Sequence, residues 1–336
     1  MKKCVPAHKV TRNSVRGARA ALTLGPLFFH WPPEKRRDFY FRMADEADID
    51  VVYLGEAVCS KREPLFAKYE KRAIDRLERA GKQVVLSSPA IVASQQEMAS
   101  IERKAASGRL VEANDLAAVQ VLAGRPFVVG PFINVLNEGA RDYLAGLGAR
   151  RFVMASELSG EAVFRLAAPD GAKGGRCAGI ETEVQVFGRQ PLSVSMRCYA
   201  ARAYGRNKDN CRFACSGHPD GLTANTLDGK PLFSVSGTSV MSHGCVVLLR
   251  EMNAMKKHGV GLFRLSPHDC DMVKVANLYR SVLNGGKDPD SARASLKKIT
   301  GSMPFINGFF HGCEGMRWIS RRTSGGKSRV SKKYFS

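Results

Sequence analysis

The repeating unit of this chain is clearest in residues 51–89, VVYLGEAVCSKREPLFAKYEKRAIDRLERAGKQVVLSSP. The apolar run at 51–55 predicts a buried strand, and the segment 64–81, with its paired Glu and Lys residues, predicts an amphipathic helix. The run at 83–89 predicts the next strand. A strand, a helix and a second strand in this order are typical of two parallel strands joined by a right-handed crossover.

The same alternation continues on both sides of this unit. Further strands are expected at 22–29, 109–114, 126–134, 151–158, 183–188 and 261–267, and further helices at 34–47, 91–107, 115–123, 137–147, 159–168, 246–258 and 271–284. About eight such units predict an α/β fold with a TIM-like (β/α)8 barrel, or an incomplete relative of one. The alternative is an open doubly wound sheet, but no G-x-G-x-x-G follows the first strand.

The strand and helix pattern also divides the chain. Residues 21–285 are expected to form the barrel domain, between a basic extension at 1–20 and a C-terminal extension at 286–336. The segment 189–245 breaks the period after the seventh strand, and its stretch LFSVSGTSVMSHG at 232–244 predicts a β-hairpin. Long insertions of this kind are usually functional.

The net charge of +21 is concentrated at the two ends. Residues 1–33 carry six Lys or Arg and residues 315–336 carry seven, with no acidic residue in either segment. Such tails are either solvated or contact anionic lipid or nucleic acid. No run of about 18 apolar residues predicts a transmembrane helix, and no export signal is recognised. A cytoplasmic protein with reduced thiols is therefore expected.

Three cysteines in the insertion carry the strongest chemical signal. Cys198, Cys211 and Cys215 form a C-x12-C-x3-C pattern in a polar, Gly-containing stretch. Three thiols close together in the sequence can bind one inorganic centre, but a tetrahedral set needs a fourth ligand. The remaining ligand must therefore come from elsewhere in the chain.

The barrel prediction suggests where that ligand lies. Loops that follow the strands of a (β/α)8 barrel share one rim, and Cys59 follows the strand at 51–55 just as the cysteine-rich insertion follows the seventh strand. Cys270, three residues beyond the last strand, is the best rival. A mixed site with His218, which is near Cys215, is a further alternative.

The spacing favours an iron–sulfur cluster over other centres. Structural zinc is usually held by two close C-x2-4-C pairs, whereas only one close pair is present here. A cluster is larger and tolerates wider, uneven spacing. Zinc and ordinary free cysteines remain as alternatives. Arg197, Arg202 and Arg212 flank the cysteines and would stabilise thiolates and raise the potential of a cluster.

Several stretches also resemble a known family. The segments VYLGEAVCSKR (52–62), GKQVVLSSPAIV (81–92), FVVGPFINVLN (127–137), EVQVFGRQPLSVSMRCYAAR (183–202) and CRFAC (211–215) are similar to the U32 peptidase family, and most closely to its ubiquinone biosynthesis branch. The resemblance runs from about Leu22 to Pro267. It departs at both ends and at PDGAKGGRCAG (169–179), which look like additions.

This resemblance carries specific implications. It implies a TIM-like barrel and a [4Fe–4S] cluster on Cys59, Cys198, Cys211 and Cys215. It also implies a heterodimer with UbiU, a second cluster-bearing U32 protein, that hydroxylates the quinone precursor ring without oxygen. A lipid-carrying accessory protein, UbiT, and prephenate as the proposed oxygen source belong to the same implied system.

Two other functions stay open at this stage. One is RNA (tRNA or rRNA) hydroxylation by a protein of the same superfamily, favoured by the positive charge. The other is a zinc-stabilised binding module. Peptidase activity is not expected, because neither a Gly-x-Ser-x-Gly elbow nor a His-Glu-x-x-His motif is present.

Polar residues at the ends of strands are the candidates for substrate contact. Glu56, Asn134 and Glu157 follow the second, fifth and sixth strands and would lie on the rim where barrel chemistry occurs. Each is also a plausible helix cap. No general base is assigned from the sequence.

Overall fold

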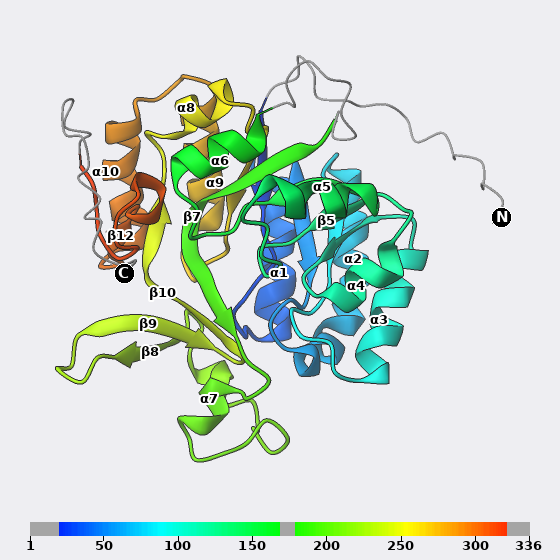
Figure 1. Ribbon diagram of the computed structural model, residues 1–336. Coiled ribbons are helices and arrows are strands. Elements are labelled where there is room, and N and C mark those ends of the chain that lie inside the picture. Colours follow the sequence, from blue (N-terminus) through cyan, green and yellow to red (C-terminus); the bar gives the residue numbers. More distant parts are fainter. Residues whose placement is uncertain (1–19, 169–178, 321–336) are drawn as a thin grey trace, which may run out of the picture.

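The computed structural model describes residues 20–168 and 179–320 (Figure 1). Most of the basic extension expected at 1–20, the Gly-rich connection at 169–178 and most of the basic C-terminal tail lie outside these residues. So do Cys4 and Cys177.

Eight parallel strands close into a barrel. In spatial order they are β1 (Ala21–Leu24), β2 (Val51–Gly55), β3 (Gln83–Ser87), β4 (Leu110–Ala113), β5 (Phe127–Val129), β6 (Ala149–Val153), the first half of β7 (Glu181–Val194) and β11 (Leu262–Leu265). The barrel closes because β11 pairs in parallel with both β7 and β1. The predicted TIM-like (β/α)8 barrel is confirmed, and it is complete.

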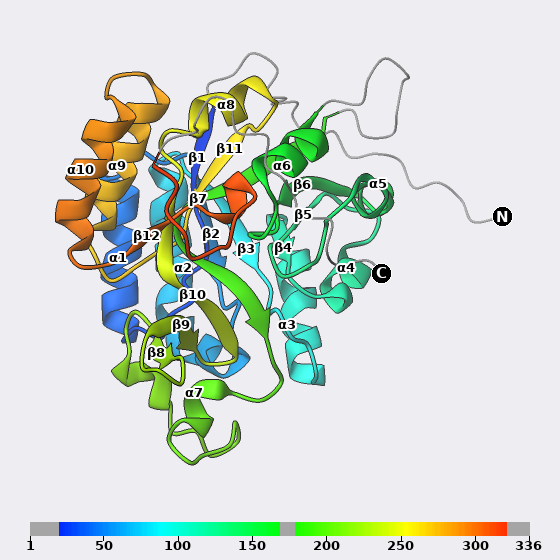
Figure 2. The same cartoon turned by 60° about the vertical axis from the view of Figure 1, so that its left-hand side comes forward.

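Helices form the outer layer of the barrel (Figures 1 and 2). They are α1 (Pro33–Asp45), α2 (Glu63–Arg79), α3 (Gln95–Ala106), α4 (Leu116–Leu122), α5 (Glu138–Gly146), α6 (Gly160–Ala167), α8 (Met252–Lys257) and α9 (Met272–Leu283). Helix α10 (Pro289–Thr300) packs against α9, and β12 (Phe305–Ile306) and the 3-10 turn η3 (Phe309–His311) follow it. No helix in the described part of the chain is long and apolar enough to cross a membrane.

The strands are buried on both faces because both faces are covered. All five residues of β2 are buried. Since successive side chains alternate between faces, Leu54 packs outward against the helices while Tyr53 joins Val85 and Val128 inside the barrel. Helix α3 begins at a reciprocal cap, in which Ser94 accepts from the Glu97 amide and donates to the Glu97 carboxylate.

A buried polar network fills the centre of the barrel. The Glu183 carboxylate accepts hydrogen bonds from Thr23 Oγ1 at 2.6 Å, Tyr53 OH at 2.5 Å and Arg264 Nε at 2.7 Å. Arg151 donates to the same Tyr53 hydroxyl at 3.2 Å. Burial alone would raise the pKa of Glu183, but Arg264 and Arg151 outweigh it and hold this pKa below its ordinary value.

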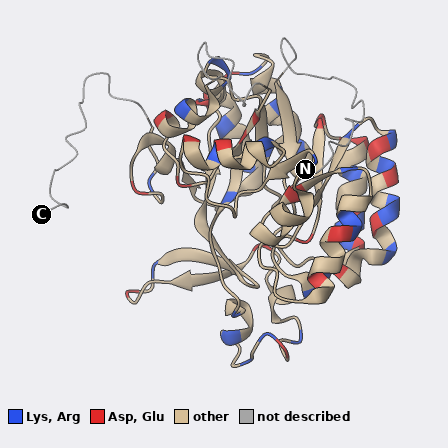
Figure 3. Ribbon diagram, turned by 45° about the vertical axis from the view of Figure 1, so that its right-hand side comes forward, with Lys and Arg blue, Asp and Glu red and all other residues tan. Residues whose placement is uncertain are grey.

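Charged residues of both signs alternate over the outer helices (Figure 3). Pairs one turn apart, such as Arg42–Glu46 at 3.0 Å and Lys71–Asp75 at 2.6 Å, are exposed. Exposed pairs of this kind add little stability, so the helical surface serves solubility more than folding.

The insertion forms a separate layer at the carboxyl end of the barrel, which we call the cysteine lobe (residues 189–245). The second half of β7 runs into it and pairs antiparallel with β10 (Ser239–Val247). The lobe also contains α7 (Tyr199–Arg202), the 3-10 turn η2 (Ala214–Gly217), β8 (Leu222–Asn225) and β9 (Pro231–Ser236). Figure 1 shows α7, β8 and β9 projecting at the bottom of the molecule. The predicted hairpin is β9–β10.

One expected element begins too early in the sequence prediction. The helix expected at 246–258 starts at Met252, because Val246 and Val247 continue β10 and pair with Gly188 and Phe187 of β7. Two β-branched residues pack well on a ladder and poorly in a helix, so the structure follows their local preference.

Candidate cluster site

The three cysteines of the C-x12-C-x3-C pattern lie together in the lobe. Cys198 is buried at the start of α7, where its Sγ accepts from the Ala201 amide at 3.4 Å. Cys211 and Cys215 pack against the same small apolar cluster, which contains Val235 of β9. All seven cysteines in the described residues have free thiols.

The loop that carries Cys211 and Cys215 is held by short-range polar contacts. Asn207 Oδ1 accepts from the amides of Asp209 and Asn210, both at 3.0 Å. Arg212 and Phe213 adopt left-handed backbone conformations, with φ of 47° and 51°. Such conformations cost non-glycine residues about 1–2 kcal/mol each and persist where the surroundings enforce them.

Cys59 approaches the lobe from the loop between β2 and α2. Its amide donates to Glu56 Oε1 at 3.3 Å, and its carbonyl accepts from the Arg62 amide at 2.9 Å in a 3-10 turn. Its side chain is partly buried against the apolar cluster of Phe28, Val58 and neighbouring residues. This turn keeps the charge of Arg62 close enough to act on the Cys59 thiol.

Arg62 joins the Cys59 loop to the lobe. Its guanidinium is 2% exposed and donates to Cys215 Sγ at 3.4 Å, to Ser236 Oγ at 3.2 Å and to the Phe28 carbonyl at 3.1 Å. Burial raises the pKa of both the Cys59 and the Cys215 thiols, while the Arg62 charge opposes that rise at each. One buried cation therefore acts on cysteines from both segments.

His30 also contacts the Cys215 side chain. Its Nδ1 lies 3.5 Å from Cys215 Sγ, and its ring meets Phe213 edge-on. Burial, together with the charges of Arg62 and Arg36, lowers the pKa of His30 to about 4. The imidazole is consequently neutral at neutral pH.

The three predicted rim residues occupy different environments. Glu56 is 1% exposed and is paired with Arg36 at 3.4 Å and Arg62 at 3.7 Å. Asn134 and Glu157 are exposed on the loops after β5 and β6. A role toward substrate stays a prediction for all three, but the Glu56 carboxylate already has partners at the cysteine site.

The side chains of the two rival ligands, Cys270 and His218, have other partners. Cys270 packs against the main core beside Met272, and burial raises the pKa of its thiol to about 12. The His218 ring is bonded to the Tyr204 hydroxyl at 2.5 Å. In residues 20–168 and 179–320, no three His, Cys, Asp or Glu side chains are grouped so that they could hold a metal ion.

The sequence did not indicate which arginine is buried beside the cysteines. Arg197, Arg202 and Arg212 flank the cysteines in the sequence, but all three are exposed. The buried cation is Arg62, which the sequence offers only as the second member of a Lys-Arg pair. Its position one 3-10 turn after Cys59 was the available signal, since such a turn returns the chain to the same side.

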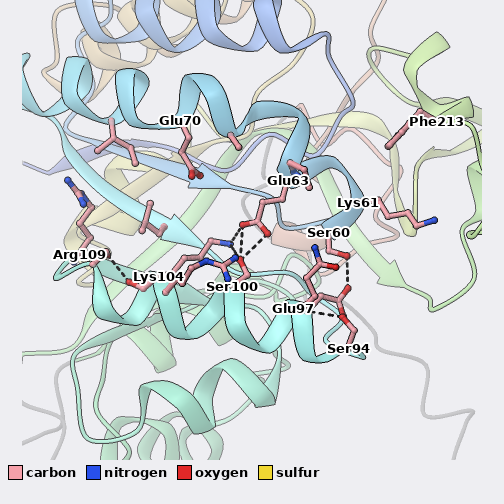
Figure 4. Close-up of a pocket in the computed structure, with 17 residues that line it drawn as sticks. Ser60, Lys61, Glu63, Glu70, Ser94, Glu97, Ser100, Lys104, Arg109 and Phe213 are labelled. Atoms are coloured by element: carbon pink, nitrogen blue, oxygen red, sulfur yellow. Dashed lines mark hydrogen bonds and ion pairs between the residues drawn. The ribbon is translucent and has the colours of Figure 1, made fainter.

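A cavity of about 810 Å³ lies beside the site, between α2 and α3 (Figure 4). Arg109 lies at one end, and near the middle Lys104 Nζ bridges to Glu63 at 2.6 Å and Ser100 donates to the same carboxylate. At the other end Lys61 and Phe213 contribute to the lining, so the cavity reaches the cysteine-bearing loop. No sequence feature had indicated it.

These observations define a class of protein, namely a closed (β/α)8 barrel with a cysteine-bearing lobe at its carboxyl end. The family model described as peptidase family U32 matches residues 39–320, and the chain belongs to that family. Among solved structures, the spore coat polysaccharide biosynthesis protein SpsE from Bacillus subtilis is similar at 11% identity. That comparison covers 88% of this chain and 74% of that one, with a TM-score of 0.37.

Proposed function

We propose that this chain is an iron–sulfur subunit of the UbiV type. It acts in an oxygen-independent hydroxylase of ubiquinone biosynthesis, with a UbiU-like U32 protein as heterodimer partner and a UbiT-like lipid carrier, in the cytoplasm. Membership of the U32 family supports the general assignment. The phrase from Gly188 to Cys198 supports the ubiquinone branch by its resemblance.

The observation that carries the cluster is the charge balance around the cysteines. Arg36, Glu56 and Arg62 form a buried triad of two cations and one anion. A buried cation without a counter-charge is costly, so the triad needs further negative charge nearby. The thiolates of a bound cluster would supply it, since Cys215 contacts Arg62 directly and Cys59 lies within reach of its charge. These contacts support the proposal that Cys59, Cys198, Cys211 and Cys215 hold a cluster.

A cluster bound there would supply one-electron transfer, with every iron already holding a thiolate. The chain's own residues prepare that environment. Arg62 and His30 hold Cys215, and the apolar side chains of Phe28, Val58 and Met241 exclude water on the Cys59 side. The lower dielectric strengthens each of these electrostatic contacts.

The cluster is tested by anaerobic reconstitution with iron and sulfide. We expect a brown protein with an oxygen-sensitive visible band and about four irons and four sulfides per chain. Cys59→Ala should lose the cluster as completely as Cys211→Ala, while Cys313→Ala, in the C-terminal segment, should keep it. A colourless wild-type protein after reconstitution overturns the proposal.

The pathway is tested by anaerobic co-purification with identification of the bound protein. Recovery of a second U32 protein and loss of ring-hydroxylated quinone when the chain is deleted support the ubiquinone assignment. Salt-dependent binding of tRNA or rRNA that survives removal of both basic tails would instead favour RNA modification.

A further inference from the structure

The positive charge of the Arg62 guanidinium is only partly balanced by negative charge nearby. Its only carboxylate partner, among the described residues, is Glu56, and Glu56 is shared with Arg36. Arg36 is itself fixed by a bond from Nη2 to the Gly55 carbonyl at 2.8 Å. The side chains of Glu56 and Arg62 are each 2% exposed, so solvent does not screen the excess charge.

The position of this charge is fixed from several sides. The Phe28 carbonyl and Ser236 Oγ each accept from the guanidinium, and they belong to the barrel rim and to the lobe. Gly237 closes the remaining side, because a Cβ there would lie 2.7 Å from Arg62 Nη2. The planar fork of arginine can satisfy these directions together, whereas a lysine presents a single ammonium.

We propose that Arg62 is a positioning residue that sets the reduction potential of the cluster through its charge beside Cys215. This inference rests on the proposed function. A reduced cluster carries one more negative charge than an oxidised one, so a nearby fixed cation stabilises the reduced form and raises the potential. The effect of an arginine charge on the potential is large at buried Arg62. It is small at the exposed arginines of the lobe, where solvent and salt screen the charge.

The test uses the reconstituted full chain, titrated anaerobically with dithionite and redox mediators and followed by EPR and visible absorption. Arg62→Gln should shift the midpoint potential to a more negative value. Arg62→Lys keeps a positive charge but not the planar fork, so its midpoint potential should lie closer to the wild-type value than that of Arg62→Gln. Arg202→Gln removes an exposed charge near Cys198 and serves as the matched control, with no measurable shift expected.

The outcomes separate this inference from the proposed function. If wild-type protein binds no cluster, the proposed function fails. If all proteins bind a cluster and Arg62→Gln has the wild-type potential, the role of Arg62 is wrong. If Arg62→Gln loses the cluster while Arg62→Lys keeps it at a near wild-type potential, the requirement for charge is supported. Loss in both variants overturns the inference, because charge then does not account for the role.

Discussion

At the scale of single residues, Gly237 shows how tightly the lobe is fitted to the barrel. It is the first central residue of the two-residue turn between β9 and β10, where it has a φ of +59°. Glycine is preferred at this position because it adopts positive φ without strain. Here it has a second task, since any side chain would meet the Arg62 guanidinium.

We expect Gly237→Ala to destabilise the protein more than Gly229→Ala. Both glycines have positive φ, so both substitutions cost about 1–2 kcal/mol of backbone strain. Only at 237 does the added methyl group contact Arg62, which adds about 1–3 kcal/mol of overpacking. Urea denaturation of the two variants measures the difference. Equal losses would show that Arg62 moves aside freely.

The sequence was a partial guide to residues at the site. Cys59 was predicted to join the lobe cysteines because parallel strands of a barrel share one rim, and the loop that carries it contacts the lobe through Arg62. The burial of Arg62 could not be predicted, because it depends on contacts with Phe28 and Ser236, which lie 34 and 174 positions away. Long-range contacts of this kind leave no local pattern in a single sequence.

At the scale of elements, contacts among Asp220, His268 and Arg189 connect the lobe to the barrel. Asp220 in the lobe accepts from His268, which follows β11, at 2.5 Å, and is paired with Arg189 at 3.3 Å. His268 Nε2 accepts in turn from the Arg189 amide at 2.9 Å. Burial would raise the pKa of Asp220, but His268 and Arg189 outweigh it and lower that pKa.

These contacts predict a pH dependence of stability. Because the folded-state pKa of Asp220 is below its unfolded value of about 3.9, its contribution is present above that pH and is lost as pH falls through the folded pKa. We expect Asp220→Asn to cost about 1–3 kcal/mol at pH 7. The difference from wild type should shrink below about pH 4.

The measurement is urea unfolding of both proteins across pH 3 to 7. Asp228→Asn, in the exposed turn between β8 and β9, is the control and should leave the profile close to wild type. A constant gap between Asp220→Asn and wild type at all pH values would contradict the assignment.

At the scale of the whole molecule, the barrel is organised around buried charge. Glu183 is fully buried and accepts hydrogen bonds from Arg264 Nε, Tyr53 OH and Thr23 Oγ1. The alternation of strands and helices was enough to predict a TIM-like barrel, because it reflects local periodicity, but it did not decide whether the barrel is complete. The polar centre was not predicted, since a Glu or Arg within an apolar run does not show by itself which face it occupies.

We expect Glu183→Gln to destabilise the protein by about 3–5 kcal/mol, because it removes one of the two buried carboxylates that pair with Arg264 and leaves Glu112 as the other. Glu181→Gln is the matched control on the same strand. Glu181 pairs with Arg151 at 2.8 Å but is partly exposed, so its loss should cost no more than about 1 kcal/mol. Guanidinium chloride unfolding compares the two, and similar losses would show that the centre of the barrel tolerates the loss of one carboxylate.

Strand β7 has a mechanical consequence for any partner. Its backbone pairs with β11 as far as Phe187 and with β10 from Phe187 to Val194, with two shifts of register between Arg189 and Ser193. One strand therefore belongs to both the barrel and the lobe, and force applied to the lobe is transmitted to the barrel through it. A subunit that docks on the lobe contacts a segment that is continuous with the barrel wall. The position of the lobe surface relative to the barrel surface is therefore set when the chain folds.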